Sequence, residues 1–97
     1  MFFLVRFHDA PAAPPDLRQR HMAAHLAFLQ SHADRIEAAG PVALPDGTAA
    51  GGAWLVRASS ADEVEDLIQA DPFWTTGLRD RHEVLAWTRV FPPQEPA

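Results

Sequence analysis

The chain has 97 residues, of which 47% are hydrophobic and 22% charged, so it is long enough for one hydrophobic core and too short for two. Acidic residues outnumber basic ones by 13 to 8, and all the basic residues are scattered arginines, which disfavours nucleic acid as a partner. The absence of cysteine excludes disulfides, thiolate metal sites and cysteine nucleophiles.

The first half of the chain predicts a strand, a loop and a long helix. Residues 2–7 form a short apolar run rich in phenylalanine, typical of a strand. Arg6 interrupts this run too early for a signal peptide or a membrane span, so we expect a cytoplasmic protein without a membrane partner. Prolines in residues 11–15 predict a loop. Asp16 is then placed to cap a helix that runs to about Ala39, where a Gly-Pro pair would stop it.

Two stripes of side chains run along this helix. Apolar residues recur at spacings of four and three, which predicts a core-facing stripe of Met22, Leu26, Leu29, Ala33 and Ile36. A second stripe beside it holds His21, His25, Phe28 and His32. We therefore expect His25 at the edge of the buried face, where a side chain can be partly shielded and still reach a cleft.

Two strands and a helix follow. Residues 42–44 are a short apolar piece that fits a second strand, and after a Pro-Asp-Gly turn residues 53–57 predict a third. Ser60 and Glu63 have the spacing of a capping box and predict the start of a helix. Its core-facing residues are Ala61, Val64, Leu67 and Ile68.

The end of the chain predicts a short helix, a strand and a tail. Asp71 precedes Pro72, which ends the previous helix and suits the start of a new one that Asp71 caps and Gly77 closes. Residues 83–91 predict the last strand. We expect one domain over residues 1–91, followed by a proline-rich tail at 92–97.

This order predicts an α+β fold of the ferredoxin-like βαββαβ kind, with a four-stranded antiparallel sheet. The last strand is apolar on both faces: Leu85 and Trp87 lie on one, Val84 and Ala86 on the other. Two helices cover only one face of such a sheet. We therefore expect a second copy to cover the other, which makes the protein a homodimer with its sheets packed face to face.

The histidines are the first candidates for chemistry. His21 and His25 stand four residues apart on one helix, a spacing that can hold a metal ion with His32 or a distant carboxylate as a third ligand. Met22, however, replaces the glutamate of the zinc-protease signature. For His21 and His32 the favoured interpretation is a partly exposed helix residue. His25 is the better candidate, because burial and a carboxylate could tune its pKa, although a histidine satisfied at the core edge explains it as well.

Four further residues are candidates for a site. Capping alone explains Asp71, but its carboxylate has lone pairs enough to orient an imidazole as well. The aromatic residues favour core and interface packing, and a pocket for a flat ligand would use the same side chains. Phe73 and Trp74 follow Asp71 closely enough to line such a pocket. Arg6 shares a strand face with Leu4, so we expect it in a dimer cavity, paired with an acidic side chain or, second, with an anionic ligand.

Several motifs resemble those of the YCII-related (YciI-like) family over residues 1–91. Residues 25–29, His-Leu-Ala-Phe-Leu, are similar to the family's helix motif, and residues 39–42, Ala-Gly-Pro-Val, to its turn. Asp71-Pro72-Phe73 is similar to its Asp-Pro-aromatic signature. The chain departs from the family at Met22, where members often carry an arginine.

The resemblance implies a fold of the dimeric α/β barrel type and a His–Asp active-site pair, carried here by His25 and Asp71. One branch of the family acts as a dehydrochlorinase on a chlorinated hydroxyquinol-type ring, and the family has no general cofactor. The first hypothesis is therefore a small cofactor-independent lyase or isomerase, with His25 as general base and acid and Asp71 holding its tautomer. Phe73, Trp74 and Arg6 would bind the substrate. The alternative is a non-catalytic module, either binding a small aromatic or anionic ligand or serving as a structural dimer.

Overall fold

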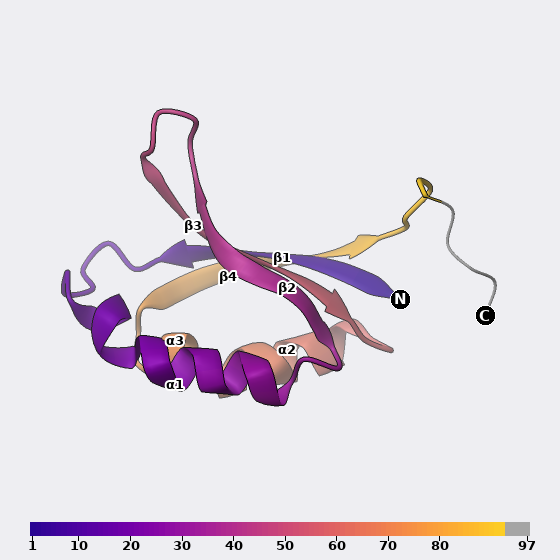
Figure 1. The fold of residues 1–97 in the computed structure, drawn as a ribbon, viewed down its shortest axis with the longest axis horizontal. Coiled ribbons are helices and arrows are strands. Elements are labelled where there is room, and N and C mark those ends of the chain that lie inside the picture. Colours follow the sequence, from indigo (N-terminus) through magenta and orange to yellow (C-terminus); the bar gives the residue numbers. More distant parts are fainter. Residues whose placement is uncertain (93–97) are drawn as a thin grey trace.

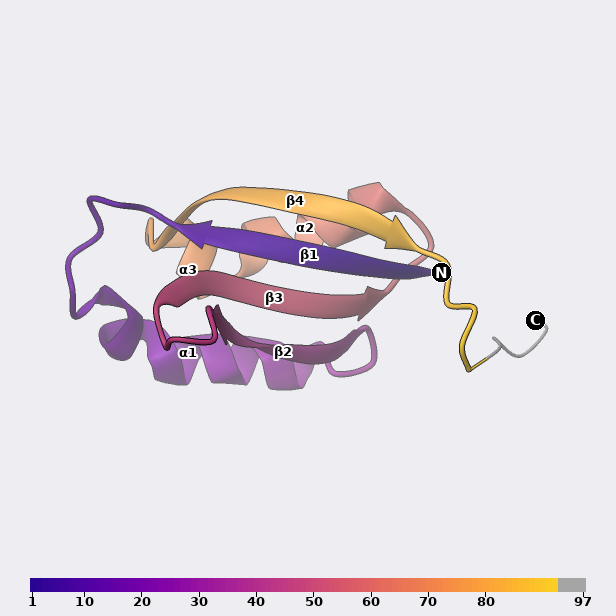
Figure 2. The same cartoon turned by 90° about the horizontal axis from the view of Figure 1, so that it is seen from above.

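A computed structural model describes residues 1–92 and confirms the predicted βαββαβ fold. The elements are β1 (Phe2–Asp9), α1 (Leu17–Ser31), β2 (Ile36–Ala43), β3 (Ala49–Arg57), α2 (Ala61–Ala70), α3 (Pro72–Thr75) and β4 (Arg79–Trp87). The strands form one antiparallel sheet in the order β2-β3-β1-β4. The helices all lie on one face of this sheet and leave the other face open (Figures 1 and 2).

The core lies between the sheet and the helices, and β1 shows why. Side chains alternate along a strand, and Phe3, Val5 and Phe7 all point to the helical side, where they are buried. Trp54 of β3 and Ile68 of α2 complete the same cluster. Each such side chain contributes about 1.5–3 kcal/mol when fully buried, so this alternation decides which face of β1 meets the helices.

The first helix ends earlier than the sequence predicts. It stops at Ser31, and the amide of Ile36 donates to the carbonyl of His32 in the turn that follows, 2.9 Å between nitrogen and oxygen. Residues 36–43 then form one strand, so the prediction that the helix runs to Ala39 was wrong. The strand predicted at 42–44 exists, but it begins at Ile36 and ends at Ala43. Pro41 fits this strand because β2 lies at the sheet edge, where a missing amide donor is tolerated.

The predicted core stripe of this helix was correct for Met22, Leu29 and Ile36 and wrong for the other two residues. Leu26 is 55% exposed and Ala33 lies outside the helix in an exposed turn, whereas His25 is only 6% exposed. Phe28 and Leu29 pack on the main core cluster, and Leu17 belongs to a second buried cluster with Phe73. The helix is thus rotated towards its histidine stripe. Asp16 makes no side-chain cap and instead pairs with Arg20 at 3.2 Å.

The caps of the other helices are where the sequence places them. The hydroxyl oxygen of Ser60 accepts the amide of Glu63 at 3.2 Å, and Asp71 caps α3. The reciprocal bond of the predicted capping box is displaced by one residue, because the Glu63 carboxylate accepts the Ser59 amide at 3.1 Å. Gly77, with a φ of +85°, follows α3 as expected.

The last two strands of the chain are longer than predicted or shifted. β3 begins at Ala49, before the predicted 53–57, and β4 runs from Arg79 to Trp87 rather than over 83–91. The reason is pairing: β4 follows β1 along its whole length, from Phe2 opposite Trp87 to Asp9 opposite Arg79. The predicted tail falls mostly at residues 93–97, outside the described part of the chain. No helix within residues 1–92 is long and apolar enough to cross a membrane.

Candidate functional site

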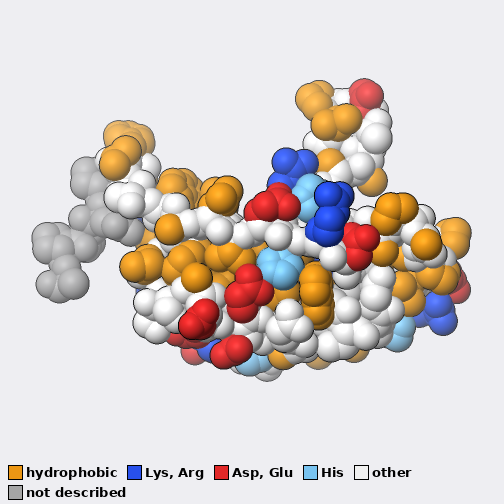
Figure 3. Space-filling model, turned by 180° about the vertical axis from the view of Figure 1, so that it is seen from behind, with side chains coloured by type: hydrophobic (Ala, Val, Ile, Leu, Met, Phe, Trp, Pro, Cys, Tyr) orange, Lys and Arg blue, Asp and Glu red, His pale blue; other side chains and the backbone are white. Residues whose placement is uncertain are grey.

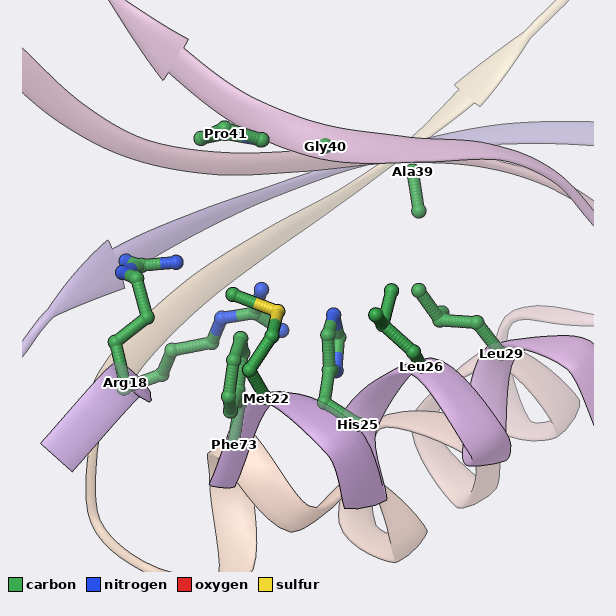
Figure 4. Close-up of a pocket in the computed structure, with 10 residues that line it drawn as sticks. Arg18, Met22, His25, Leu26, Leu29, Ala39, Gly40, Pro41 and Phe73 are labelled. Atoms are coloured by element: carbon green, nitrogen blue, oxygen red, sulfur yellow. The ribbon is translucent and has the colours of Figure 1, made fainter. Parts of the chain in front are cut away.

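A cavity of about 170 Å³ lies between α1 and the edge strand β2 (Figure 4). Its walls are mainly apolar side chains and the backbone of β2, with three basic side chains among them. The lining residues are Arg18, Met22, His25, Leu26, Leu29, Ala39, Gly40, Pro41, Phe73 and Arg79. A cavity of about 150 Å³ holds one benzene molecule in a well-studied engineered protein, so this volume suits a single six-membered ring.

His25 lies deep in this cavity. Its imidazole rises from α1 towards β2 in Figure 4 and stacks flat on the ring of Phe73, with centroids 3.8 Å apart. Nδ1 lies 2.8 Å from Oδ1 of Asp71, whereas Nε2 has no hydrogen-bonding partner within residues 1–92. Since a carboxylate only accepts, a neutral His25 donates from Nδ1 and keeps a lone pair on Nε2.

Asp71 lies between α2 and α3 and is completely buried. Oδ1 accepts the amide of Phe73 at 3.0 Å as well as the imidazole N–H, and Oδ2 accepts Nη1 of Arg79 at 2.9 Å. Asp71 therefore caps the helix and contacts the imidazole at once, which its lone pairs were expected to allow. The carboxylate fixes both the ring orientation and the tautomer of His25.

Arg79 and Arg18 line the cavity, and sequence reasoning missed both; Arg79 is the one bound to Asp71. It begins β4, is 5% exposed, and stacks its guanidinium over the ring of Phe7 with Cζ 4.0 Å from the centroid. Burial lowers the pKa of Arg79 below its ordinary value, against the opposing effect of the Asp71 charge. Gly52 leaves the necessary space, because a Cβ there would lie 3.2 Å from Nη2. No local pattern singles Arg79 out; the pairing of β4 with β1 brings it to Asp71.

Two of the predicted ligand-binding residues are not at this cavity. Trp74 turns away from it, donating from Nε1 to Oε1 of Gln69 at 3.1 Å and meeting the ring of His82 edge-on. Arg6 lies on the open face of the sheet, where it lines a separate hollow with His8 and Arg81. Of the predicted site residues, the structure thus brings together His25, Asp71 and Phe73.

The histidine spacing on α1 does not assemble a metal site. Within residues 1–92 no three histidine or acidic side chains lie close enough together to share an ion. His32 instead accepts a hydrogen bond from Arg35, with 2.9 Å between nitrogens. His25 uses its Nδ1 on Asp71.

Comparison with known proteins gives a consistent result. Residues 1–88 match the YCII-related domain. Among solved structures, the chain is similar to the 5-chloro-2-hydroxyhydroquinone dehydrochlorinase from Burkholderia phenoliruptrix AC1100, in complex with 2,5-dihydroxybenzoquinone. The two are 32% identical, with a TM-score of 0.74 over 91% of this chain and 94% of that one, which confirms a fold of the dimeric α/β barrel type. No curated protein matches the sequence. The chain belongs to the YCII-related domain family.

Proposed function

We propose that the protein is a small lyase or isomerase of the dehydrochlorinase type, which acts on a small oxygenated aromatic ring without a cofactor. The observation that carries this proposal is the buried His25–Asp71 pair in a cavity of single-ring size. The similarity to a dehydrochlorinase in complex with a dihydroxybenzoquinone supports the same substrate class.

His25 is the proposed base. Its Nε2 takes a proton from a ring hydroxyl, and the imidazolium returns that proton to the ring carbon that bears the halogen, which gives a keto tautomer. His25 then takes the proton of a second hydroxyl. The electron pair of that O–H bond moves through the ring and expels the halide with the electrons of the carbon–halogen bond. One proton and one halide leave in total, so the ring becomes a quinone without an external oxidant.

Asp71 and Arg79 assist through position and charge. The carboxylate lies 2.8 Å from Nδ1 and stabilises the imidazolium that forms at each proton transfer. Arg79 holds the other carboxylate oxygen at 2.9 Å and prevents it from turning away. The flat contact with Phe73 fixes the plane of the imidazole. A proton transfer by a positioned base of this kind contributes about 10²–10⁴-fold in rate.

The test is release of chloride from 5-chloro-2-hydroxyhydroquinone, followed by quinone absorbance. We expect turnover by the wild-type protein and a loss of about 10²–10⁴-fold in the His25→Ala variant. Asp71→Asn should lose turnover as well, since Nδ1 would lose its ionic partner. His21→Ala is the matched control on the same helix and should retain full activity. Wild-type protein without turnover, or unchanged turnover in His25→Ala, would contradict an enzyme of this type.

The second candidate function is a non-catalytic ligand-binding or structural module. This candidate is favoured because Asp71 caps α3 and pairs with Arg79, and both contacts stabilise the fold without any reaction. If His25→Asn and Asp71→Asn fold normally and lose ligand binding, while the wild type turns nothing over, the binding module is correct. If both variants lose only melting temperature, the pair is structural.

We also propose that the protein is a homodimer. On the open sheet face Leu4 and Leu85 are exposed, Leu85 by 56%. Hydrophobic side chains also gather on the two projections that flank this face, the β2–β3 hairpin and the segment after β4 (Figure 3). A second copy packed sheet to sheet would cover these side chains. In that arrangement Arg6, in the hollow with His8 and Arg81, would meet an acidic side chain of the partner or an anionic ligand.

A further inference from the structure

Arg18 and His25 stand on the same side of α1. They are seven residues apart, which is two helical turns, and both line the cavity. The guanidinium carbon of Arg18 lies 5.4 Å from the centre of the Phe73 ring, on which His25 stacks at 3.8 Å. Figure 4 shows Arg18 and His25 on either side of Met22. A ligand in the cavity would therefore meet a base at one point and a permanent cation at another.

The two arginines of the cavity differ in what they can offer a ligand. Arg79 is buried and held by Asp71. The side chain of Arg18 is 32% exposed, and the one hydrogen bond it makes within the described residues runs from Nη2 to Oδ2 of Asp9. A guanidinium carries five N–H donors, so most of those on Arg18 are free for a ligand.

Asp9 orients Arg18 through a partly exposed ion pair. It lies at the end of β1, and its side chain is 34% exposed. Partly exposed pairs of this kind contribute about 0–1 kcal/mol, so an anion inside the cavity can share or replace the contact. Beside Arg18 the cavity wall includes the apolar Met22 and Pro41 and the guanidinium of Arg79, which Asp71 already holds.

We infer that Arg18 binds an acidic oxygen of the ligand, a ring phenolate or carboxylate, and so restricts the site to anionic aromatic compounds. This inference rests on the proposed function for the cavity as the ligand site. An anion entering apolar walls loses its hydration and is accepted only where a cation pairs with it. The planar fork of Arg18 suits a carboxylate or a pair of neighbouring ring oxygens, while His25 faces the hydroxyl that reacts.

The test uses isothermal titration calorimetry to compare two ligands of nearly the same shape, the anionic 2,5-dihydroxybenzoate and the neutral 2,5-dihydroxybenzamide. We expect the wild-type protein to bind the acid at least about tenfold tighter than the amide, since one good charge-assisted contact is worth about a factor of ten. Arg18→Gln should remove this preference by weakening the acid alone. Arg18→Lys, which retains the charge and loses the fork, should keep part of it.

Arg20→Gln is the matched control, because Arg20 lies on the same helix and pairs outside the cavity with Asp16. It should bind the acid as the wild type does. Equal binding of acid and amide by the wild type, binding of neither, or an unchanged preference in folded Arg18→Gln would overturn the inference. The binding assay needs no turnover, so it separates this inference from the proposed activity. If the wild type releases no chloride but Arg18→Gln loses the preference for the acid, the proposed enzyme is wrong and this inference holds.

Discussion

The carboxylate of Asp71 has no exposed surface and accepts hydrogen bonds from a backbone amide, an imidazole and a guanidinium. A buried ion pair of this kind is strongly destabilising when one partner is removed, because the other charge stays buried without compensation. The position therefore connects the stability of the domain to the chemistry proposed for its cavity.

At this position we predict that Asp71→Asn lowers the free energy of unfolding by about 3–5 kcal/mol, the usual cost of breaking a buried pair. Urea denaturation measures it, with Asp66→Asn on the exposed side of α2 as control. Adding Arg79→Met to Asp71→Asn should recover part of the loss, since no charge is then left unpaired. A double variant as unstable as the sum of both single ones would contradict this account.

His25 and Asp71 are 46 positions apart, and no spacing rule connects them. The cap motif identified Asp71, and the helix pattern placed His25 near a cleft, but only the resemblance to a family joined the two. Arg79 could not be found in this way, because its role depends on the register between β4 and β1 and on the gap at Gly52. Arg18 faces the cavity because α1 is rotated, which the apolar pattern of the helix did not predict.

Among the secondary-structure elements, the sequence predicted correctly those that depend on neighbouring residues alone. The strand predicted at residues 2–7 and the Ser60 cap of α2 were both confirmed. The predicted end of α1 was wrong because Ala33 and Ile36 continue the apolar spacing of the helix. In the structure, residues 36–43 pair with β3 and belong to the sheet instead. Tertiary pairing here overrides a helical pattern that has no strong stop signal before Gly40.

The start of α2 allows a prediction about acid stability. Hydrogen bonds from the Ser59 hydroxyl and amide lower the pKa of Glu63 below its ordinary value of 4.5. A carboxylate with a depressed folded-state pKa stabilises the fold fully above its unfolded pKa and loses that contribution as the pH falls through the folded one. We therefore expect the melting temperature of Glu63→Gln to fall less than that of the wild type as the pH drops below about 4.5. Asp62→Asn, on the same turn, is the control. If the melting temperature of Glu63→Gln falls with pH as steeply as that of the wild type, the hydrogen bonds between Ser59 and Glu63 do not stabilise the fold.

For the whole molecule, the prediction concerns the open sheet face. At micromolar concentration we expect light scattering to give the mass of two chains. Leu85→Glu should give one chain, because it would place two charges in the face-to-face interface. Ala24→Glu, on the exposed side of α1, should leave the dimer intact. A monomeric wild-type protein would contradict the proposed dimer.

The edge position of β2 has a consequence for the range of ligands. One wall of the cavity is a strand held by hydrogen bonds to β3 alone, while the opposite wall is a helix packed on the core. An edge strand can lift away from a helix without breaking the centre of the sheet. If the cavity binds a ligand as proposed, the polar contacts at His25 and Arg18 would set which oxygens that ligand carries, whereas β2 would set how thick it can be. Differences in ring substituents between related proteins should therefore be matched by changes in residues 39–41, more than by changes near the His–Asp pair.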